Sequence, residues 1–358
     1  MQSFDIVKEV KPKKSFRVSS VIGKFDLQSE KITEHFTGGF DLSKEWQIGV
    51  IFGHSGTGKT TIAKELFKDS YIKGFDYRAE TILDDMPESE SVESITKMFN
   101  SVGFASPPSW LKPYSVLSTG EKMRVDLARA ILECKELIVF DEFTSVVDRV
   151  VAKIGSYAIS KAIRRSNKKF IAISCHEDII EWLEPDWTFN TNDMSFKYTR
   201  GLLRRPQIEL AIFEDKEKSS WELFRKYHYL NTNINMTARQ FVAFYNEIPV
   251  AFIAVMHFPH PATKKFKRAT RLVVLPDCQG VGIGHRMSSF VAEYFVRMGY
   301  RFIVTSANNV LAIQRKKSKN WKLKRFGRVS GEHEKQTCNV NKKTVSSKRL
   351  TTSWEYVL

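Results

Sequence analysis

The stretch GHSGTGKT, residues 53–60, limits the folds open to this 358-residue chain more than any other feature. It fits the pattern G-x-x-x-x-G-K-[ST], follows the apolar run QIGVIFG and precedes the helix-like segment TTIAKELFK. Glycines let backbone N–H groups close around phosphate oxygens, and a helix N-terminus adds a favourable dipole. The pattern predicts a nucleoside triphosphate site made by Gly53, His54, Ser55, Gly56, Thr57, Gly58, Lys59, Thr60 and Thr61.

The side chains of this site imply a magnesium nucleotide. Lys59 is expected to reach the β- and γ-phosphates, and the Thr60 hydroxyl to ligate Mg²⁺. The segment ELIVFDEFTSVVD, residues 136–148, reads as a buried strand ending in Asp141, a second Mg²⁺ ligand at the same sheet edge. Glu142 follows, where a general base would polarise the attacking water. By themselves the two acids are equally compatible with capping a strand, and the upstream loop favours the nucleotide site.

Between these two motifs lies SVLSTGEKMRVDLARA, residues 115–130, a Ser-Thr-Gly-Glu turn in front of an amphipathic helix. Read alone, the stretch is turn chemistry, and Ser118 simply caps the helix. Further along, FIAISC at 170–175 reads as a third buried strand, followed by His176. Strands that alternate with helices over this length indicate a parallel α/β sheet.

The order of these motifs over roughly residues 15–190 resembles the ABC ATPase family. The resemblance makes LSTGE the counterpart of the family's Leu-Ser-Gly-Gly-Gln signature, Asp148 its D-loop acid and His176 its switch histidine. It implies ATP hydrolysis with Mg²⁺ by a head-to-tail homodimer. In that dimer, Ser118 and Gly120 of one copy cap the ATP bound by Lys59 of the other.

The chain also departs from the ABC pattern. Thr119 and Glu121 replace a glycine and a glutamine of the signature, and no glutamine stands between the glycine-rich loop and Leu117 to serve as the Q-loop residue. Asp84 or Asp85 lies about where that glutamine belongs. Phe16 and Phe25 are both candidates for the aromatic residue that stacks on adenine. We expect a divergent branch of the family, outside the transporters.

Charge divides the chain into two halves. Residues 201–358 hold 28 Lys and Arg against 11 Asp and Glu, a net charge of +17, whereas residues 1–200 carry a net charge of −1. Such an imbalance favours a polyanionic partner for the second half, a nucleic acid and in particular DNA, over a basic surface that only aids solubility. The segment RKKSKNWKLKRFGR, residues 315–328, sets cations beside aromatics, as phosphate contact with base stacking requires.

Composition excludes several other classes. No apolar run is long enough for a membrane span, and the N-terminus has charges where a signal peptide needs its apolar segment, so a cytosolic (cytoplasmic) protein is expected. The four cysteines are scattered, which favours neither a zinc site nor a disulfide framework. His257 and His260 flank a proline and would make two metal ligands, but without a clear third ligand a structural role is favoured.

A second glycine-rich turn occurs in RLVVLPDCQGVGIGHRM, residues 271–287, between an apolar strand and a helix. A Rossmann interpretation requires an acid about 20 residues on, and RFIVTSAN supplies none. The unit resembles the core of the GNAT acyltransferase family. The resemblance implies that acetyl-CoA or another acyl-CoA is held through its pyrophosphate by Gln279, Gly280, Val281, Gly282, Ile283 and Gly284.

A narrower resemblance joins KYHYLN at 226–231, HFPHP at 257–261, the strand led by Arg271 and the QGVGIG turn. Together they look like the GNAT-like phage Mom-type proteins, which alter adenine in DNA, and such a fusion suits phage or mobile-element biology. The matching positions are His228, Tyr229, Arg271 and Ser306, of which His228 or Tyr229 would polarise an acceptor amine. Aromatic packing at a helix end explains KYHYL equally well.

The predicted fold is α/β: a P-loop ABC-type nucleotide-binding domain with a helical insertion, followed by an α+β GNAT-like domain. The expected domains are residues 1–195, a linker at 196–206, and 207–358 with a basic C-terminal tail. The favoured function is an ATPase coupled to group transfer on DNA, by adenine modification or acyl transfer. The alternatives are a DNA-binding remodelling or repair ATPase whose GNAT-like fold only binds, and the ATPase subunit of a transporter.

Overall fold

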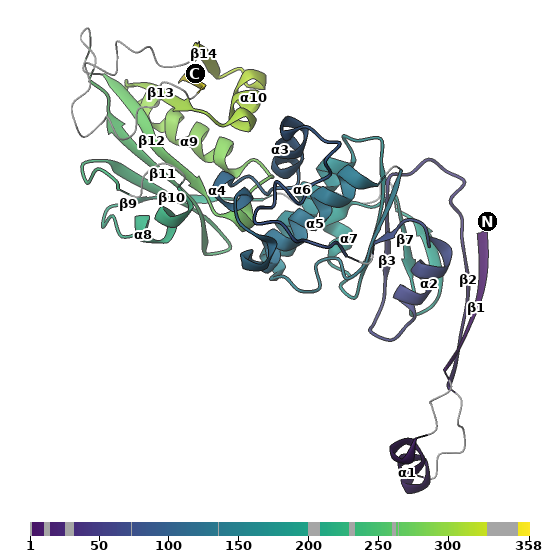
Figure 1. The fold of residues 1–358 in the computed structure, drawn as a ribbon. Coiled ribbons are helices and arrows are strands. Elements are labelled where there is room, and N and C mark those ends of the chain that lie inside the picture. The colour runs from purple at the N-terminus through teal and green to yellow at the C-terminus, as the bar shows by residue number, and fades with distance from the viewer. Residues whose placement is uncertain are drawn as a thin grey trace. The chain divides into compact units, whose positions relative to one another are not determined.

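The computed structural model describes residues 2–10, 15–25, 32–72, 74–134, 136–199, 208–228, 233–259, 263, 265–327 and 350–358. Its contacts divide the chain into two compact units (Figure 1). The first unit comprises residues 1–75, 130–148 and 159–206, and the second comprises residues 76–129, 149–158 and 207–358. The second unit therefore holds the helical insertion together with the C-terminal half. Two helices, α5 (Thr119–Glu133) and α6 (Arg149–Ile163), each contribute to both units.

The first unit is built on a mostly parallel sheet. Among its described residues the strand order is β4-β5-β6-β3-β7-β8, with only β8 antiparallel to its neighbour. The strands are β3 (Ile48–Phe52), β4 (Tyr71–Ile72), β5 (Leu137–Phe140), β6 (Lys169–Ser174), β7 (Trp187–Asn190) and β8 (Ser195–Tyr198). Two short helices accompany them, α2 (Lys59–Leu66) and α7 (Ile179–Leu183). Every residue of β3 is buried, as expected for a central parallel strand, which reads as an unbroken apolar run.

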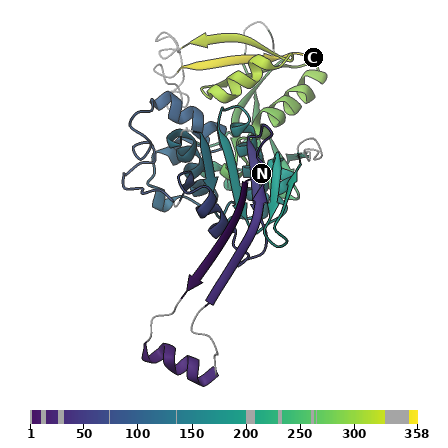
Figure 2. The ribbon, with the colours of Figure 1, turned by 90° about the vertical axis from the view of Figure 1, so that its right-hand side faces the viewer.

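A long hairpin precedes the sheet. Strands β1 (Gln2–Val10) and β2 (Ile32–Phe40) pair antiparallel along their whole length (Figure 2). Aromatic residues of the hairpin, Phe4, Phe36 and Phe40, join the core of the first unit. Helix α1 (Phe16–Phe25) stands between the two strands in the sequence and buries none of its residues. The alternation of this hairpin was missed because its polar face obscures the apolar one.

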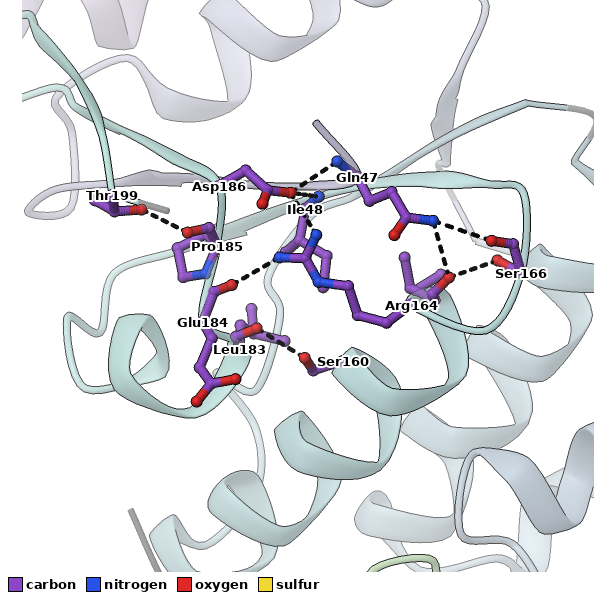
Figure 3. Close-up of polar contacts among 11 residues, drawn as sticks. Gln47, Ile48, Ser160, Arg164, Ser166, Leu183, Glu184, Pro185, Asp186 and Thr199 are labelled. Carbon is purple, nitrogen blue, oxygen red and sulfur yellow. Dashed lines mark hydrogen bonds and ion pairs between the residues drawn. The ribbon is translucent and has the colours of Figure 1, made fainter. Parts of the chain in front are cut away.

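A carboxylate fixes the amino end of the central strand β3 (Figure 3). The buried Asp186 accepts hydrogen bonds from the backbone N–H groups of Gln47 and Ile48, at 2.7 and 3.0 Å, and from the Arg164 guanidinium at 2.6 Å. Arg164 also donates to the Glu184 carbonyl at 2.9 Å. Burial raises the pKa of Asp186, but these donors outweigh it and hold that pKa below its ordinary value.

The second unit opens with the helical segment. It consists of α3 (Val92–Ser101), α4 (Pro107–Trp110), the 3₁₀ turn η1 (Tyr114–Val116) and the start of α5. Tyr77 and Tyr114 stack with ring centroids 3.9 Å apart, and each hydroxyl donates to one carboxylate oxygen of Asp126, at 2.7 and 2.8 Å. Burial raises the pKa of Asp126, and the two donors partly offset that rise. This cluster ties the segment before the Ser-Thr-Gly-Glu turn to helix α5.

The C-terminal part of the second unit is a mostly antiparallel sheet. Its described strands follow the order β14-β15-β13-β12-β11-β10-β9, in which β12 and β13 are parallel. The strands are β9 (Ala211–Asp215), β10 (Arg239–Tyr245), β11 (Ile248–His257), β12 (Phe266–Val274), β13 (Arg301–Ser306), β14 (Trp321–Gly327) and β15 (Thr351–Tyr356). The remaining elements are α8 (Trp221–Phe224), η2 (Arg225–Tyr227), η3 (Pro276–Cys278), α9 (Ile283–Arg297) and α10 (Asn309–Lys317).

Each face of this sheet has its own core. Helix α9 packs on one face with Val291 and Phe295 against Phe302, while α8 packs on the other with Trp221 and Phe224 (Figure 1). Two features differ from the sequence-based expectation. The segment predicted as a basic tail supplies strands β14 and β15, and part of the predicted linker is strand β8. Residues 200–206 of that linker lie outside the described residues. No helix that the structure describes is long and apolar enough to cross a bilayer.

Candidate functional site

The glycine-rich loop of the first unit follows β3 and leads into α2. Gly56 and Gly58 have φ of 84° and 85°, in the left-handed region that favours glycine. Gly58 is the N-cap of α2 and makes no side-chain cap, so the first N–H groups of the helix are left for a ligand. The Lys59 ammonium donates to the carbonyls of Gly53 and His54, at 2.9 and 2.6 Å. The loop thus holds its own lysine through two of its backbone carbonyls.

Residues after β7 anchor this loop, and sequence reasoning missed them. The Asn192 side chain accepts the His54 N–H at 2.9 Å, and the hydroxyls of Thr57 and Thr191 share a hydrogen bond at 2.5 Å. Thr57 also contacts the His54 carbonyl at 2.8 Å. No motif marks Thr191 or Asn192, because their role depends on β7 lying beside β3.

Strand order brings the predicted acidic residues to the same sheet edge. Strands β5, β6 and β3 are neighbours and parallel, so Asp141, His176 and the glycine-rich loop follow adjacent carboxyl ends. Asp141 accepts hydrogen bonds from the Thr60 hydroxyl at 2.8 Å and from the Tyr71 hydroxyl at 2.5 Å. Burial, the bond to Asp141 and the nearby negative charges raise the pKa of Tyr71. The oxygens of Thr60 and Asp141 therefore converge as hard ligands suited to Mg²⁺.

Glu142 and His176 stand at this edge as well. Glu142 is exposed and adopts φ of 52°, a conformation rare for a residue with a side chain. Its N–H donates to the Asp141 carboxylate at 2.9 Å. His176 is partly exposed, and its N–H donates to the Ser174 hydroxyl at 3.1 Å. Backbone strain of this kind concentrates at functional sites.

The Ser-Thr-Gly-Glu turn lies in the second unit and forms a reciprocal cap. The Ser118 hydroxyl accepts the Glu121 N–H at 3.2 Å, and the Glu121 carboxylate accepts the Ser118 N–H at 3.0 Å. Ser109 donates to the second Glu121 oxygen at 2.9 Å, and Glu121 is buried. The carboxylate at position 121 is therefore explained by helix capping. Asp148, the predicted D-loop acid, is exposed and is the last residue of the segment 130–148, which belongs to the first unit.

Other nucleotide-site candidates have structural surroundings of their own. Asp85 accepts the N–H groups of Arg78 and Ala79, at 2.9 and 3.1 Å, and Asp84 accepts the Thr81 hydroxyl at 2.5 Å. Both carboxylates thus stabilise the turns of their own segment. Phe16 and Phe25 are 89% and 65% exposed on α1. The replacement of the Q-loop glutamine and the adenine-stacking aromatic stay predictions.

The second glycine-rich loop follows β12 and η3 and leads into α9. Gly280 and Gly282 have φ of 90° and 97°, and Gly282 is the N-cap of α9 with no side-chain cap. A Cβ built on Gly282 would meet nothing within 4 Å, so the mouth of this loop is open. A 15-residue helix therefore presents its first unpaired N–H groups to an anion. An open helix start of this kind suits an anionic group, and the predicted pyrophosphate site stays a prediction.

Beside this loop two parallel strands separate. Strands β12 and β13 are paired from Phe266 with Arg301 to Ala269 with Val304, yet β12 continues to Val274 and β13 to Ser306. A bulge in the β11–β12 ladder, between Ala254 and Val255, bends the sheet at the same level. The hydrogen-bonded ladder between β12 and β13 therefore ends before either strand does.

The predicted transferase residues are divided between the two faces of the sheet. Arg271 donates to the carbonyls of Thr270 and Asn233, both at 2.9 Å, and alternates with Leu272 and Val274, which pack on the α9 face. It therefore shares the α8 face with His228, whose ring lies 5.9 Å from that of Trp221. Ser306 has the parity of Phe302 and Val304 on the α9 face, and its hydroxyl accepts the Asn308 N–H at 3.0 Å. Tyr229 lies outside the described residues.

In the described part of the chain, nothing supports a metal site at the predicted pair His257 and His260. His257 ends β11, His260 is not among the described residues, and no cluster of three or more metal-ligating side chains occurs in the ranges that the structure describes. Cys134, Cys175 and Cys278 are free thiols. Burial raises the pKa of Cys278 to about 12, so this thiol is inert at neutral pH.

A buried cation lies behind the second loop. The Arg315 side chain on α10 is fully buried, and its Nε and Nη1 have no hydrogen-bond partner among the described residues. Its guanidinium lies 4.9 Å from the centre of the Trp321 ring and 3.4 Å from the Ser288 hydroxyl. Burial lowers the pKa of Arg315 to about 10. Burial and the charges of Arg315 and Arg286 lower the pKa of His285, in the first turn of α9.

One comparison with known proteins matches a family model to the end of the first unit and to much of the C-terminal part of the second unit. Residues 177–314 match the model of the acetyltransferase (GNAT) family, and no curated protein matches the chain. A bacterial Atm1-family ABC exporter with ATP bound shares 19% identity over 44% of this chain, with a TM-score of 0.34. An IAA acetyltransferase from Bacillus cereus ATCC 14579 shares 14% identity over 42% of this chain and all of its own, with a TM-score of 0.32.

These matches differ in what they establish. The chain spans a third of the exporter chain, and at these TM-scores neither solved structure bears on the fold. The family model rests on sequence. Its match begins in the first unit, with α7, β7 and β8, and continues through β9–β13, the open glycine-rich loop and α9 of the second unit. The family model therefore supports a GNAT-like domain in the C-terminal half of the chain.

Proposed function

We propose that the second unit transfers an acyl group from acyl-CoA to an amine. The observation that carries this proposal is the uncapped start of α9 beside two parallel strands that separate after Ala269 and Val304. Acyl-CoA supplies an activated thioester when bound. Backbone N–H groups from Gly282 to Gly284 would hold its pyrophosphate, and the unpaired ends of β12 and β13 would orient its thioester end.

Acyl transfer then requires few groups from the protein. The acceptor amine attacks the thioester carbonyl, the new C–N bond forms, and the C–S bond breaks to release CoA as a thiolate, to which the proton lost by the amine finally passes. His228 or Tyr229 takes the proton of the amine, and Arg271 orients the acceptor on the α8 face. Ser306, on the opposite face, supports the α10 turn beside the cofactor.

We further propose that the first unit binds and hydrolyses ATP. Supporting observations are the left-handed glycines of the loop, the position of Lys59, and the converging oxygens of Thr60 and Asp141. Thr60 and Asp141 would hold Mg²⁺, which neutralises phosphate charge when bound. Glu142 orients the attacking water, and His176, which follows β6, lies at the same edge of the sheet. A homodimer places Ser118 and Gly120 of one copy over the ATP of the other.

DNA is the acceptor that the charge of the second unit favours. Edge strand β14 exposes Lys322, Lys324 and Arg325, together with Phe326, which is 66% exposed. Cations beside an exposed ring suit phosphate contact with base stacking. Charged residues on an edge strand also prevent aggregation, so the experiment must separate the two roles.

The test incubates the protein with DNA, Mg-ATP and acetyl-CoA or other acyl-CoA donors and examines nucleosides by mass spectrometry. An acylated nucleoside that disappears in Arg271→Ala supports transfer to DNA. Unmodified DNA with every donor, together with salt-sensitive DNA binding that depends on Lys322 and Arg325, supports the alternative of a remodelling or repair ATPase. For the ATPase, Glu142→Gln should retain ATP binding and lose hydrolysis. Normal hydrolysis by that variant would show that the base is another residue.

A further inference from the structure

The two loops proposed to bind ligands in the second unit are connected by one buried arginine. Arg124, in α5 just after the Ser-Thr-Gly-Glu turn, is fully buried. Its guanidinium donates to the Pro276 carbonyl at 2.8 Å and to the Asp277 carbonyl at 2.6 Å. These carbonyls belong to η3, the turn that leads into the second glycine-rich loop. One side chain therefore holds the backbone on which that loop begins.

Close backbone approaches reinforce this connection. The Gln279 side chain accepts the Ala105 N–H and donates to the Val274 carbonyl, both at 2.9 Å. A Cβ on Gly103 would lie 2.7 Å from the Gln279 carbonyl oxygen, and one on Gly280 would lie 2.8 Å from the Cα of Gly103. At Gly103 and Gly280 the helical segment and the loop therefore meet backbone to backbone, with no flexible side chain at that point to absorb a displacement.

The Ser-Thr-Gly-Glu turn touches the same loop. A Cβ on Gly120 would lie 2.6 Å from a carboxylate oxygen of Asp277, and that oxygen lies 3.5 Å from Arg124 Nη1. Ser118 and Gly120 are the groups proposed to grip the γ-phosphate of a second copy's ATP. A γ-phosphate brought to this turn places negative charge near the Asp277 carboxylate. Closely packed contacts of this kind pass a displacement on, because interiors are rigid and close-packed.

We propose that Arg124 is a positioning residue for the acyl-CoA loop, and that through it nucleotide at the Ser118–Gly120 turn changes the affinity of the protein for acyl-CoA. The inference rests on both proposed functions. The occupant of the second loop is acyl-CoA, and the effector is a nucleoside triphosphate. By linkage, acyl-CoA must change the affinity for the nucleotide by the same factor.

A purely structural clamp would be built differently. Helix packing alone is served by apolar side chains, whereas a buried guanidinium has a desolvation cost that only well-placed acceptors offset. Burial lowers the pKa of Arg124, and the nearby Asp277 opposes that shift. The acceptors here are carbonyls of one turn, so the bonds set the position of that turn rather than simply filling space.

The experiment measures the affinity of the full-length Glu142→Gln protein for acetyl-CoA by calorimetry, with and without Mg-ATP. We expect a change of about 10-fold, and the same factor for ATP with and without acetyl-CoA. Arg124→Lys keeps the charge but cannot bridge both carbonyls, so the factor should fall to about 1. Arg129→Lys is the matched control on the same helix, because Arg129 donates to the Asp76 carbonyl, and it should keep the factor.

The outcomes are distinguishable. If either ligand fails to bind by itself, the proposed function fails and the coupling with it. If both ligands bind but neither changes the affinity for the other, the proposed function stands and the coupling is refuted. If Arg124→Lys unfolds, Asp277→Asn replaces it, since Asp277 is 40% exposed at its side chain and the change removes only charge. An unchanged coupling factor in Arg124→Lys, or an equal loss in Arg129→Lys, refutes the assigned role of Arg124.

Discussion

The two glycine-rich loops of this protein have almost the same backbone and opposite surroundings. Each follows a strand, places two left-handed glycines two residues apart, and ends on a glycine N-cap without a side-chain cap. Of these two glycines in the first loop, Gly58 is the crowded one, because its Cβ would lie 2.4 Å from the Phe36 ring, while Gly56 is open. Gly53, at the start of the same loop, is crowded by the Thr191 hydroxyl. In the second loop the crowded one is Gly280, against Gly103, while Gly282 is open.

The two loops have similar backbones, but different residues hold them in place, and this favours different ligands. Side chains of the first loop itself stabilise it: Lys59 donates hydrogen bonds to the loop carbonyls, and the Thr60 hydroxyl donates one to Asp141. The second loop has no such lysine and is held from outside, by Arg124 and Gly103 of the helical segment. A helix start alone attracts any anion. The surrounding side chains determine whether that anion carries a metal ion and is hydrolysed, or presents an acyl chain to a gap between strands.

The largest expected effect comes from Lys59. Lys59→Ala removes the cation facing the phosphates, and ATP affinity should fall by about 100-fold. The affinity for acetyl-CoA, measured without nucleotide, should stay within about 2-fold, since the second loop lies in another unit. Lys68→Ala, an exposed lysine two residues past α2, is the matched loss of charge and should change neither. A comparable loss of ATP binding in that control would mean that charge acts at long range.

The crowded glycine of the first loop gives the next largest effect. Gly58→Ala combines a left-handed φ with a clash against the buried Phe36, and should cost about 3 kcal/mol of unfolding free energy. Gly56→Ala has the same φ and open space, and should cost about 1 kcal/mol. Urea unfolding of both variants measures the difference. Equal costs would place Phe36 away from Gly58 in solution.

In the second loop the first glycine, Gly280, is the crowded one, so its substitution should cost more unfolding free energy than that of the second, Gly282. Gly280→Ala forces a Cβ against the backbone of Gly103 and should cost about 2 kcal/mol, whereas Gly282→Ala meets only the strain of its φ and should cost about 1 kcal/mol. Gly280→Ala should also weaken acetyl-CoA binding more than Gly282→Ala, because it displaces the loop from the helical segment. The reverse order in calorimetry would contradict the close packing of Gly103 on this loop.

Sequence reasoning predicted the elements whose signal is local. The runs around Ile48–Phe52, Leu137–Phe140 and Lys169–Ser174 form the expected strands, and the helix after the QGVGIG turn is α9. The GNAT resemblance is confirmed by the family model over residues 177–314. The ATPase, the DNA partner and the dimer stay predictions.

The contacts that support the loops could not be predicted. Tyr71, Thr191 and Asn192 carry no motif, and they reach the first loop only because β4 and β7 lie in its sheet. Arg124 reads as one polar position of an amphipathic helix, and its carbonyl partners lie 152 and 153 residues away. Strand β14 was hidden because Lys322, Lys324 and Arg325 dominate its pattern. Strand β15 was hidden because its only apolar residues, Trp354 and Tyr356, are too few to mark a strand, although both pack in the core.

Two buried arginines complete the comparison, and the second gives the smallest effect. Arg124 has two carbonyl acceptors, whereas Arg315 has a ring and one distant hydroxyl. Burial lowers the pKa of Arg315 to about 10, so its buried charge destabilises the folded protein at neutral pH. This destabilisation decreases only as the pH rises above about 10, where the folded protein loses the proton. Arg315→Met should therefore raise the unfolding free energy at pH 7 by about 1 kcal/mol, the lost contact with Trp321 offsetting part of the gain. The same change at the exposed Arg286 should stay within about 0.5 kcal/mol in urea unfolding. A loss of several kcal/mol in Arg315→Met would show that this cation has an anionic partner in solution.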